Sequence, residues 1–115
     1  TWGAMTQRCL AAAQPFDGQI EIIDLRTIIP WGQEMVLESV QRSGKILVVH
    51  EDTLTTGFGA EILAVVASQA FTLLDAPPER MAVPDIPIPY NINLMNEVLP
   101  RPDNIREKMR RLLEY

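Results

Sequence analysis

The sequence predicts an α/β fold of three layers, in which a mostly parallel sheet of about five strands carries helices on both faces. Short apolar runs rich in β-branched residues alternate along the chain with longer helix-like segments, the pattern expected of such a sheet. The clearest unit is Lys45 to Ala64, where an apolar run, an acidic turn, two glycines and an apolar helix follow one another. Ligands and partners of α/β sheets commonly bind where a strand leads into a helix, so a functional site is expected here first.

The composition indicates one domain spanning residues 1–115. Of the 115 residues, 47% are hydrophobic and 22% charged, as in ordinary globular domains. The net charge of −5 disfavours nucleic acid as a partner and favours a basic protein surface. The single Cys9 excludes an internal disulfide, and no apolar run approaches the roughly 20 residues of a membrane-spanning helix. Because the sequence starts at Thr1 without a Met, we expect a strand or whole domains upstream in a longer polypeptide.

The first half of the chain predicts a helix, a strand and a second helix. Met5–Gln14 combines good helix formers with a one-sided apolar pattern. Gln19–Ile29 alternates and then becomes continuously apolar, which predicts a strand. Gln33–Arg42 predicts the next helix, with Ser43-Gly44 ending it. Lys45–Val49 is then the strand of the central unit, and the polar residues from position 50 onward are expected to end it.

The second half continues the alternation of helices and strands. Ala60–Leu74 predicts a largely apolar helix, and Glu79–Val83 predicts a short strand. Three prolines between Pro84 and Tyr90 predict a rigid extended surface segment. A helical turn is expected within Asn91–Leu99, and a final helix, Asn104–Tyr115, is expected to be capped by Asp103.

The polar residues around the central unit do not assemble a known catalytic motif. Gly57 and Gly59 favour a tight turn over a phosphate-binding loop, because no phosphate-binding motif surrounds them. His50 and Glu51 could form a base and its orienting group, but neighbours on a strand point to opposite faces, which favours a structural histidine with its hydrogen bonds satisfied. Arg26, late in its strand, is expected to form a structural ion pair with Asp24 or Glu51.

Two further candidates favour structural interpretations. Cys9 lies on the apolar side of its helix, which indicates an inert core thiol. Glu51, Asp52 and Glu61 match no cation-binding loop and are better explained as solvated carboxylates near a helix N-terminus. The residues alone therefore predict an α/β domain without a self-contained active site, whose function comes from assembly.

Three blocks of sequence together resemble one family. They are Ile23 to Trp31 (IDLRTIIPW), Val49-His50-Glu51 with Gly57 to Ile62 (GFGAEI), and Leu74 to Pro77 (LDAP) with Asp85 to Tyr90 (DIPIPY). In order and spacing these blocks are similar to the transketolase C-terminal-like domain of the β subunit of 2-oxo acid dehydrogenase E1 components, and most similar to the branched-chain (2-oxoisovalerate) type. Gly32, Thr56 and Ile86 depart from the usual residues of that family, where an Asp, a Gly and a Thr are common.

The resemblance implies a domain that assembles an enzyme and holds no catalytic group. In this family thiamine diphosphate lies between other domains, the α subunit holds its diphosphate and Mg²⁺, and the activating Glu belongs to the N-terminal domain of the β subunit. No residue of this chain is therefore assigned to catalysis, cofactor or metal, and the chain alone is expected to be inactive. The residues Arg26, His50, Glu51, Gly57 and Gly59 are assigned to the structure of the sheet's crest, the edge where the strands lead into helices.

The resemblance also implies partners. They are the E1 α subunit, a second β subunit in an α2β2 heterotetramer, and the basic subunit-binding domain of the E2 acyltransferase, for which Asp75 and the carboxylate of Tyr115 are the docking candidates. The same domain of a pyruvate or acetoin dehydrogenase, or a free-standing interaction module of this fold, remains as an alternative. The implied location is the bacterial cytoplasm, or the mitochondrial matrix in a eukaryote.

Overall fold

The computed structural model describes all residues 1–115 and has a parallel two-stranded sheet at its centre. Strand β1 (Leu47–Thr53) pairs in parallel with β2 (Glu79–Val83), with Leu47 opposite Glu79 and Val49 opposite Met81. The ladder is irregular between Val49 and Thr53. The helices are α1 (Met5–Ala13), α2 (Gln33–Ser43), α3 (Gly59–Gln69), α4 (Ile92–Val98) and α5 (Pro102–Leu113), with short 3₁₀ turns η1 (Gln14–Phe16) and η2 (Phe71–Leu73).

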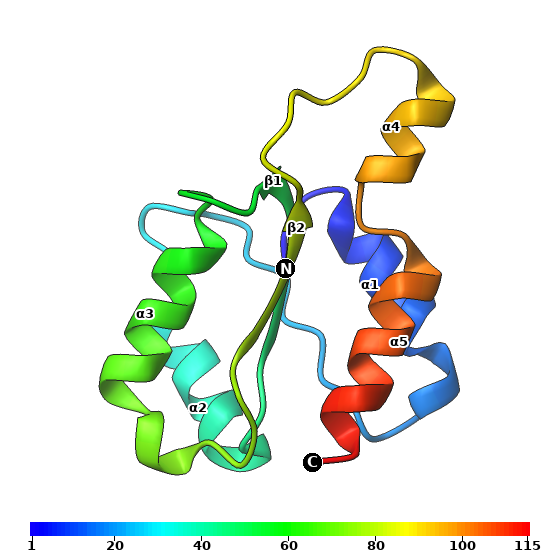
Figure 1. Cartoon of the computed structure of the whole chain (residues 1–115). Helices are drawn as coiled ribbons and strands as arrows, with labels where there is room; N and C mark the ends of the chain where they lie inside the picture. Colours follow the sequence, from blue (N-terminus) through cyan, green and yellow to red (C-terminus); the bar gives the residue numbers. More distant parts are fainter.

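Helices cover both faces of the strands, which confirms the predicted three layers. In Figure 1, α2 and α3 lie on one side of β1 and β2, and α1 and α5 lie on the other. Each side has its own apolar core. The core on the α2 and α3 side includes Val40, Val48, Ile62 and Val66, and the core on the α1 and α5 side includes Met5, Cys9, Val49, Ile105 and Met109. The α/β class with parallel strands is thus confirmed.

The number of strands is smaller than the five expected. Gln19–Ile29 was predicted to be a strand, but no part of it enters the sheet. Its side chains nevertheless alternate between the two cores, with Ile20 and Ile22 against one and Ile23 and Leu25 in or against the other. The periodicity of the sequence therefore identified an extended segment correctly, while strand pairing also requires a neighbouring backbone, which periodicity does not supply.

Other element ends differ by a few residues. His50, Glu51 and Asp52 do not end the central strand, because β1 continues to Thr53. Helix α3 stops at Gln69 and is followed by η2, so the predicted helix to Leu74 is too long. Asp103 lies in the first turn of α5, whose N-cap is Arg101, with Pro102 at the first helical position that proline favours.

The prediction for the extended surface segment is confirmed. Residues 84–90 contain no helix or strand, and α4 follows, with the Asn91 side chain accepting hydrogen bonds from the backbone of Asn93 and Leu94. This segment and α4 project beyond the body of the molecule (Figure 1). No helix has both the length and the apolar character required to cross a bilayer.

Candidate functional sites

The crest of the sheet is built around the side chain of His50. This residue is 0% exposed, on the α3 side of β1, and its ring stacks on Trp2 with 5.2 Å between centroids and 6° between planes. Phe58 adds an edge contact to Trp2 and another to Trp31. This aromatic cluster could not be identified from the sequence, because Trp2, Trp31 and Phe58 are distant in sequence and belong to no common motif.

The two glycines of the central unit make room for this imidazole. A Cβ on Gly59 would lie 2.4 Å from His50 Nε2, and a Cβ on Gly57 would lie 2.8 Å from His50 Cε1 and 2.2 Å from the carbonyl oxygen of Thr53. Neither glycine has a positive φ, whereas Thr56 between them and the strand has φ 63°. Neither glycine is therefore needed for a positive φ: a side chain at Gly59 would collide with His50, and one at Gly57 would collide with His50 and with the Thr53 carbonyl across the turn.

The expectation of a histidine with satisfied hydrogen bonds is wrong. Neither ring nitrogen of His50 has a hydrogen-bond partner within the chain. Burial lowers the pKa of the imidazole; the nearby Asp52 opposes this effect, and Arg80 adds to it. The side chain therefore packs as a neutral ring. Glu51 is exposed, whereas His50 is buried, so the two do not form a base with its orienting group.

Arg26 forms the expected ion pair with Asp24, but in an exposed position. Its Nε lies 2.8 Å from Asp24 Oδ2, and the side chains are 86% and 23% exposed, respectively. Asp24 is held independently, because it accepts a hydrogen bond from the Thr6 hydroxyl at 3.0 Å. An exposed pair of this kind contributes little to stability.

The proposed docking residue Asp75 lies at the end of the sheet where the strands begin, opposite the crest that contains His50. It lies shortly before β2, whose first residue pairs with the first residue of β1, whereas the turn that follows His50 and leads into α3 lies at the other end of the strands. The backbone N–H of Asp75 donates to the Gly44 carbonyl at 2.8 Å, and its exposed carboxylate lies directly against Gly44, where a Cβ would be 2.2 Å from Oδ2. Gly44 also has φ 65° and ends α2, so two requirements fix a glycine there.

The chain end lies at the same edge as Asp75. The Lys45 ammonium, next to Gly44, donates to the carbonyl of Leu113 at 3.3 Å. Figure 1 accordingly shows the C-terminus at the same end of the molecule as the connection from η2 to β2. Tyr115 is 68% exposed. The two residues assigned from the resemblance therefore share an edge, and Gly44 and Lys45, which link them, were not identified from the sequence.

The acidic side chains of this chain are not clustered in the way that a cation site requires. Such a site needs several oxygen ligands for the cation, and no group of three or more His, Cys, Asp or Glu side chains is arranged to bind a metal. A cavity of about 320 Å³ within the fold is lined mostly by apolar side chains. Gly57 and Gly59 are buried, so their amides are not open to an anion.

Fold and sequence together define the class of protein. Residues 1–105 match the transketolase C-terminal domain family, and the chain belongs to it. A solved chain described as a split-gene transketolase, an inactive β4 tetramer, superposes with a TM-score of 0.79 over 98% of this chain and 37% of its own length, at 18% identity, and so supports the fold.

The curated relatives are more specific. The β subunit of 2-oxoisovalerate dehydrogenase from Bacillus subtilis is 34% identical across 100% of this chain and 36% of its own length. The mitochondrial β 2 subunit of 2-oxoisovalerate dehydrogenase from Arabidopsis thaliana is 44% identical over 76% of this chain and 25% of its own length. The pyruvate dehydrogenase E1 β subunit of Rickettsia conorii is 39% identical over 83% of this chain and 29% of its own length. The resemblance to E1 β subunits is thereby confirmed, and the chain spans about a quarter to a third of these relatives.

Proposed function

We propose that this chain is the C-terminal assembly and E2-docking domain of the β subunit of a branched-chain 2-oxo acid dehydrogenase. The whole enzyme would decarboxylate 2-oxoisovalerate and related acids oxidatively with thiamine diphosphate and Mg²⁺, and would transfer the acyl group to lipoyl E2. The cofactor would be held by the α subunit and by the rest of the β subunit. We place the enzyme in the bacterial cytoplasm, or in the mitochondrial matrix of a eukaryote, in line with the sources of the relatives.

The observation that carries the docking role is the exposed carboxylate of Asp75, which lies against Gly44. The backbone N–H of the same residue donates to the Gly44 carbonyl. An exposed carboxylate on a chain of net charge −5 suits a basic partner, and complementary charges chiefly raise the association rate and fix the orientation of docking. The basic subunit-binding domain of E2 has the required sign of charge.

The other candidate is the same domain of a pyruvate dehydrogenase β subunit, which the Rickettsia conorii relative favours. We prefer the branched-chain type because two stretches of the sequence, Ile28-Ile29-Pro30-Trp31 and His50-Glu51, resemble that type more than the pyruvate type. Assaying the enzyme with 2-oxoisovalerate and with pyruvate separates these two candidate functions. The assembled enzyme is needed, because the substrate contacts would belong to domains outside this chain. A third possibility is a free-standing interaction module, and such a module would not bind an E1 α subunit.

The docking role is tested by Asp75→Asn in the assembled E1. Loss of a charge-assisted hydrogen bond should weaken binding of the E2 subunit-binding domain by about 1–3 kcal/mol, because asparagine keeps the shape and loses the charge. Isothermal titration at two salt concentrations measures this, and salt should weaken the wild-type complex more than the variant complex. Decarboxylation in a model assay without E2 should not change.

A matched control is Asp52→Asn, which removes an exposed carboxylate at the opposite edge of the sheet. It should leave E2 affinity within error of wild type. Equal affinities of wild type and Asp75→Asn at low salt would remove Asp75 from the docking site.

A further inference from the structure

The layer formed by α2 and α3 carries a shallow groove of about 320 Å³ on its surface. Its lining residues come from one face of α2 and from the end of α3 with η2, and they include Glu34, Leu37, Glu38, Gln41, Ala70 and Leu73. In Figure 1 both helices lie on the side of the strands away from α1 and α5. We call this feature the α2–α3 groove.

The floor of the α2–α3 groove is apolar. Ala70 is buried, Leu37 packs partly buried against the core, and Leu73 is 43% exposed. Phe71, in the same 3₁₀ turn as Leu73, is 71% exposed. Large apolar side chains that are left together in water are typical of a surface that a partner covers.

The rim of the groove is acidic. Glu34 and Glu38 are one helical turn apart on α2, and both are exposed. Like charges at this spacing repel each other, and the ion pairs of the chain all use other carboxylates. A cation placed between these two side chains would therefore be bound favourably.

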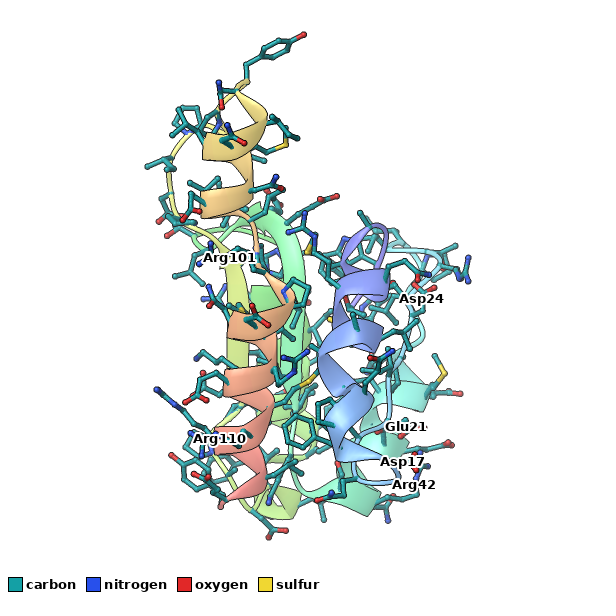
Figure 2. All side chains as sticks on the ribbon, turned by 90° about the vertical axis from the view of Figure 1, so that its right-hand side faces the viewer. Asp17, Glu21, Asp24, Arg42, Arg101 and Arg110 are labelled. Carbon is teal, nitrogen blue, oxygen red and sulfur yellow. The ribbon has the colours of Figure 1, made fainter.

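No cation of the chain neutralises this rim. Each of the 10 lysine and arginine side chains donates to a carboxylate or a backbone carbonyl elsewhere. Arg42 is the cation of α2, and Figure 2 shows it beside Glu21, whose carboxylate lies 3.0 Å from it. The cation that suits Glu34 and Glu38 must therefore come from a partner.

We propose that the α2–α3 groove binds a basic amphipathic helix of a partner protein. The helix places a stripe of leucine-like side chains on Leu37 and Leu73, and lysine or arginine beside the stripe pairs with Glu34 and Glu38. A helix is the fitting shape because the groove is formed by helices, which cover the strands on this side, so that no strand edge is open there. The acidic rim disfavours nucleic acid.

This surface is distinct from the docking residue of the proposed function, because Asp75 does not line the groove. The inference therefore goes beyond E2 docking. It identifies the partner by the chemistry of one helix, in which apolar and basic residues share a face.

The experiment titrates the 115-residue chain with the peptide acetyl-AAALKAKLKAKLAA-amide, in which lysines flank a single stripe of leucines when the peptide is helical. Amide shifts in NMR spectra locate the binding site. Residues 34–41 and 69–73 should shift together, with half-saturation below ~1 mM at low salt. A peptide with glutamate in place of each lysine should bind at least ~10-fold more weakly, because it is repelled by the rim.

Variants of the chain separate the rim from general attraction to a negative protein. Glu34→Gln combined with Glu38→Gln should weaken binding of the lysine peptide by at least about 4-fold, because two exposed ion pairs are lost. The matched control is Glu51→Gln combined with Glu61→Gln, which removes the same net charge from exposed positions outside the groove and should change affinity less than about 2-fold.

The apolar floor is tested in the same way. Leu73→Ser should weaken binding at least ~5-fold, whereas Leu10→Ser, at a partly exposed leucine of α1, should not. Circular dichroism checks that each variant is folded.

Three outcomes overturn the proposal. One is the absence of saturable binding at the highest peptide concentration. Another is an equal loss of affinity in the rim variant and its control, which would show attraction to the net charge alone. Shifts centred on Asp75 and the chain end would assign the basic helix to the docking surface of the proposed function, which would then stand while the groove would not.

Discussion

At the scale of single residues, the environment of His50 explains the two glycines that follow it. Gly59→Ala would place a methyl group 2.4 Å from a fully buried ring that is stacked on Trp2 and cannot move freely. We expect a loss of about 2–3 kcal/mol in the free energy of unfolding, the usual cost of overpacking a core. Urea denaturation measures it.

The matched control is Gly32→Ala. A Cβ at Gly32 would approach the flexible end of Met35, 3.1 Å away, and this side chain can move. The loss should be about 1 kcal/mol or less, mainly from a poorer helix N-cap. Similar losses for the two variants would contradict the packing role of Gly59.

The lowered pKa of the His50 imidazole makes stability depend on pH. An imidazole in the unfolded chain takes up a proton below about pH 6.5, whereas the folded chain resists protonation until a lower pH. The unfolded state therefore binds more protons in this interval, and the free energy of unfolding falls as the pH is lowered from about 6.5 toward the folded pKa. Above pH 6.5 this contribution is constant.

His50→Leu isolates this effect, because other groups, including the Thr1 amine with its lowered pKa, titrate in both proteins. Urea unfolding of wild type and variant between pH 7.5 and 5.5 should show a steeper decline for wild type, by at most about 1.4 kcal/mol per pH unit for one proton. If the free energy of unfolding fell equally with pH in wild type and variant, His50 would be protonated equally easily in the folded and unfolded states.

At the scale of elements, the connection from β1 to α3 carries strain at Thr56. A β-branched residue with φ 63° is unusual, and the left-handed conformation costs L-residues about 1–2 kcal/mol. Glycine removes that cost but loses more conformational freedom on folding. Thr56→Gly should therefore stabilise the chain by about 0.5–1 kcal/mol in thermal or urea unfolding.

The neighbouring position gives a control of opposite sign. The backbone amide of Thr55 donates to the Asp85 carboxylate at 2.8 Å, and the Thr55 hydroxyl donates to the same carboxylate. Thr55→Gly removes the hydroxyl and should destabilise the chain. If both variants shifted stability in the same direction, general loop flexibility would explain the results better than strain at Thr56.

The elements show what the sequence could and could not predict. Local signals were sufficient where a boundary depends on nearby residues: the Glu79–Val83 strand was predicted to the residue, and the start of α2 at Gln33 likewise. Pairing was not predictable for Gln19–Ile29, because it depends on which backbone lies beside that segment. The burial of His50 was missed for a similar reason, since Trp2 and Gly59 meet it only in the folded chain.

At the scale of the molecule, two of the candidate partner surfaces lie apart. Asp75 and the chain end lie at one edge, while the segment from Pro84 and α4 project from the other end (Figure 1). That projection exposes Ile86, Ile88, Tyr90, Ile92 and Leu94. A run of exposed large apolar side chains is typical of a protein contact. If the proposed function is correct, this projection is a subunit contact of the E1 assembly.

Tyr90 provides the sharpest test of that contact. Its side chain is 104% exposed, so Tyr90→Ala should leave the melting temperature of the isolated chain unchanged. Within full-length subunits that carry this domain, loss of a buried aromatic anchor should weaken assembly about tenfold or more, as measured by analytical ultracentrifugation. Leu10→Ala, which truncates a partly exposed apolar residue on α1, is the matched control and should leave assembly unchanged. Unaltered assembly of the Tyr90→Ala enzyme would exclude the tip of the projection from the subunit contact, whereas a loss in both variants would indicate a general effect of removing surface apolar groups.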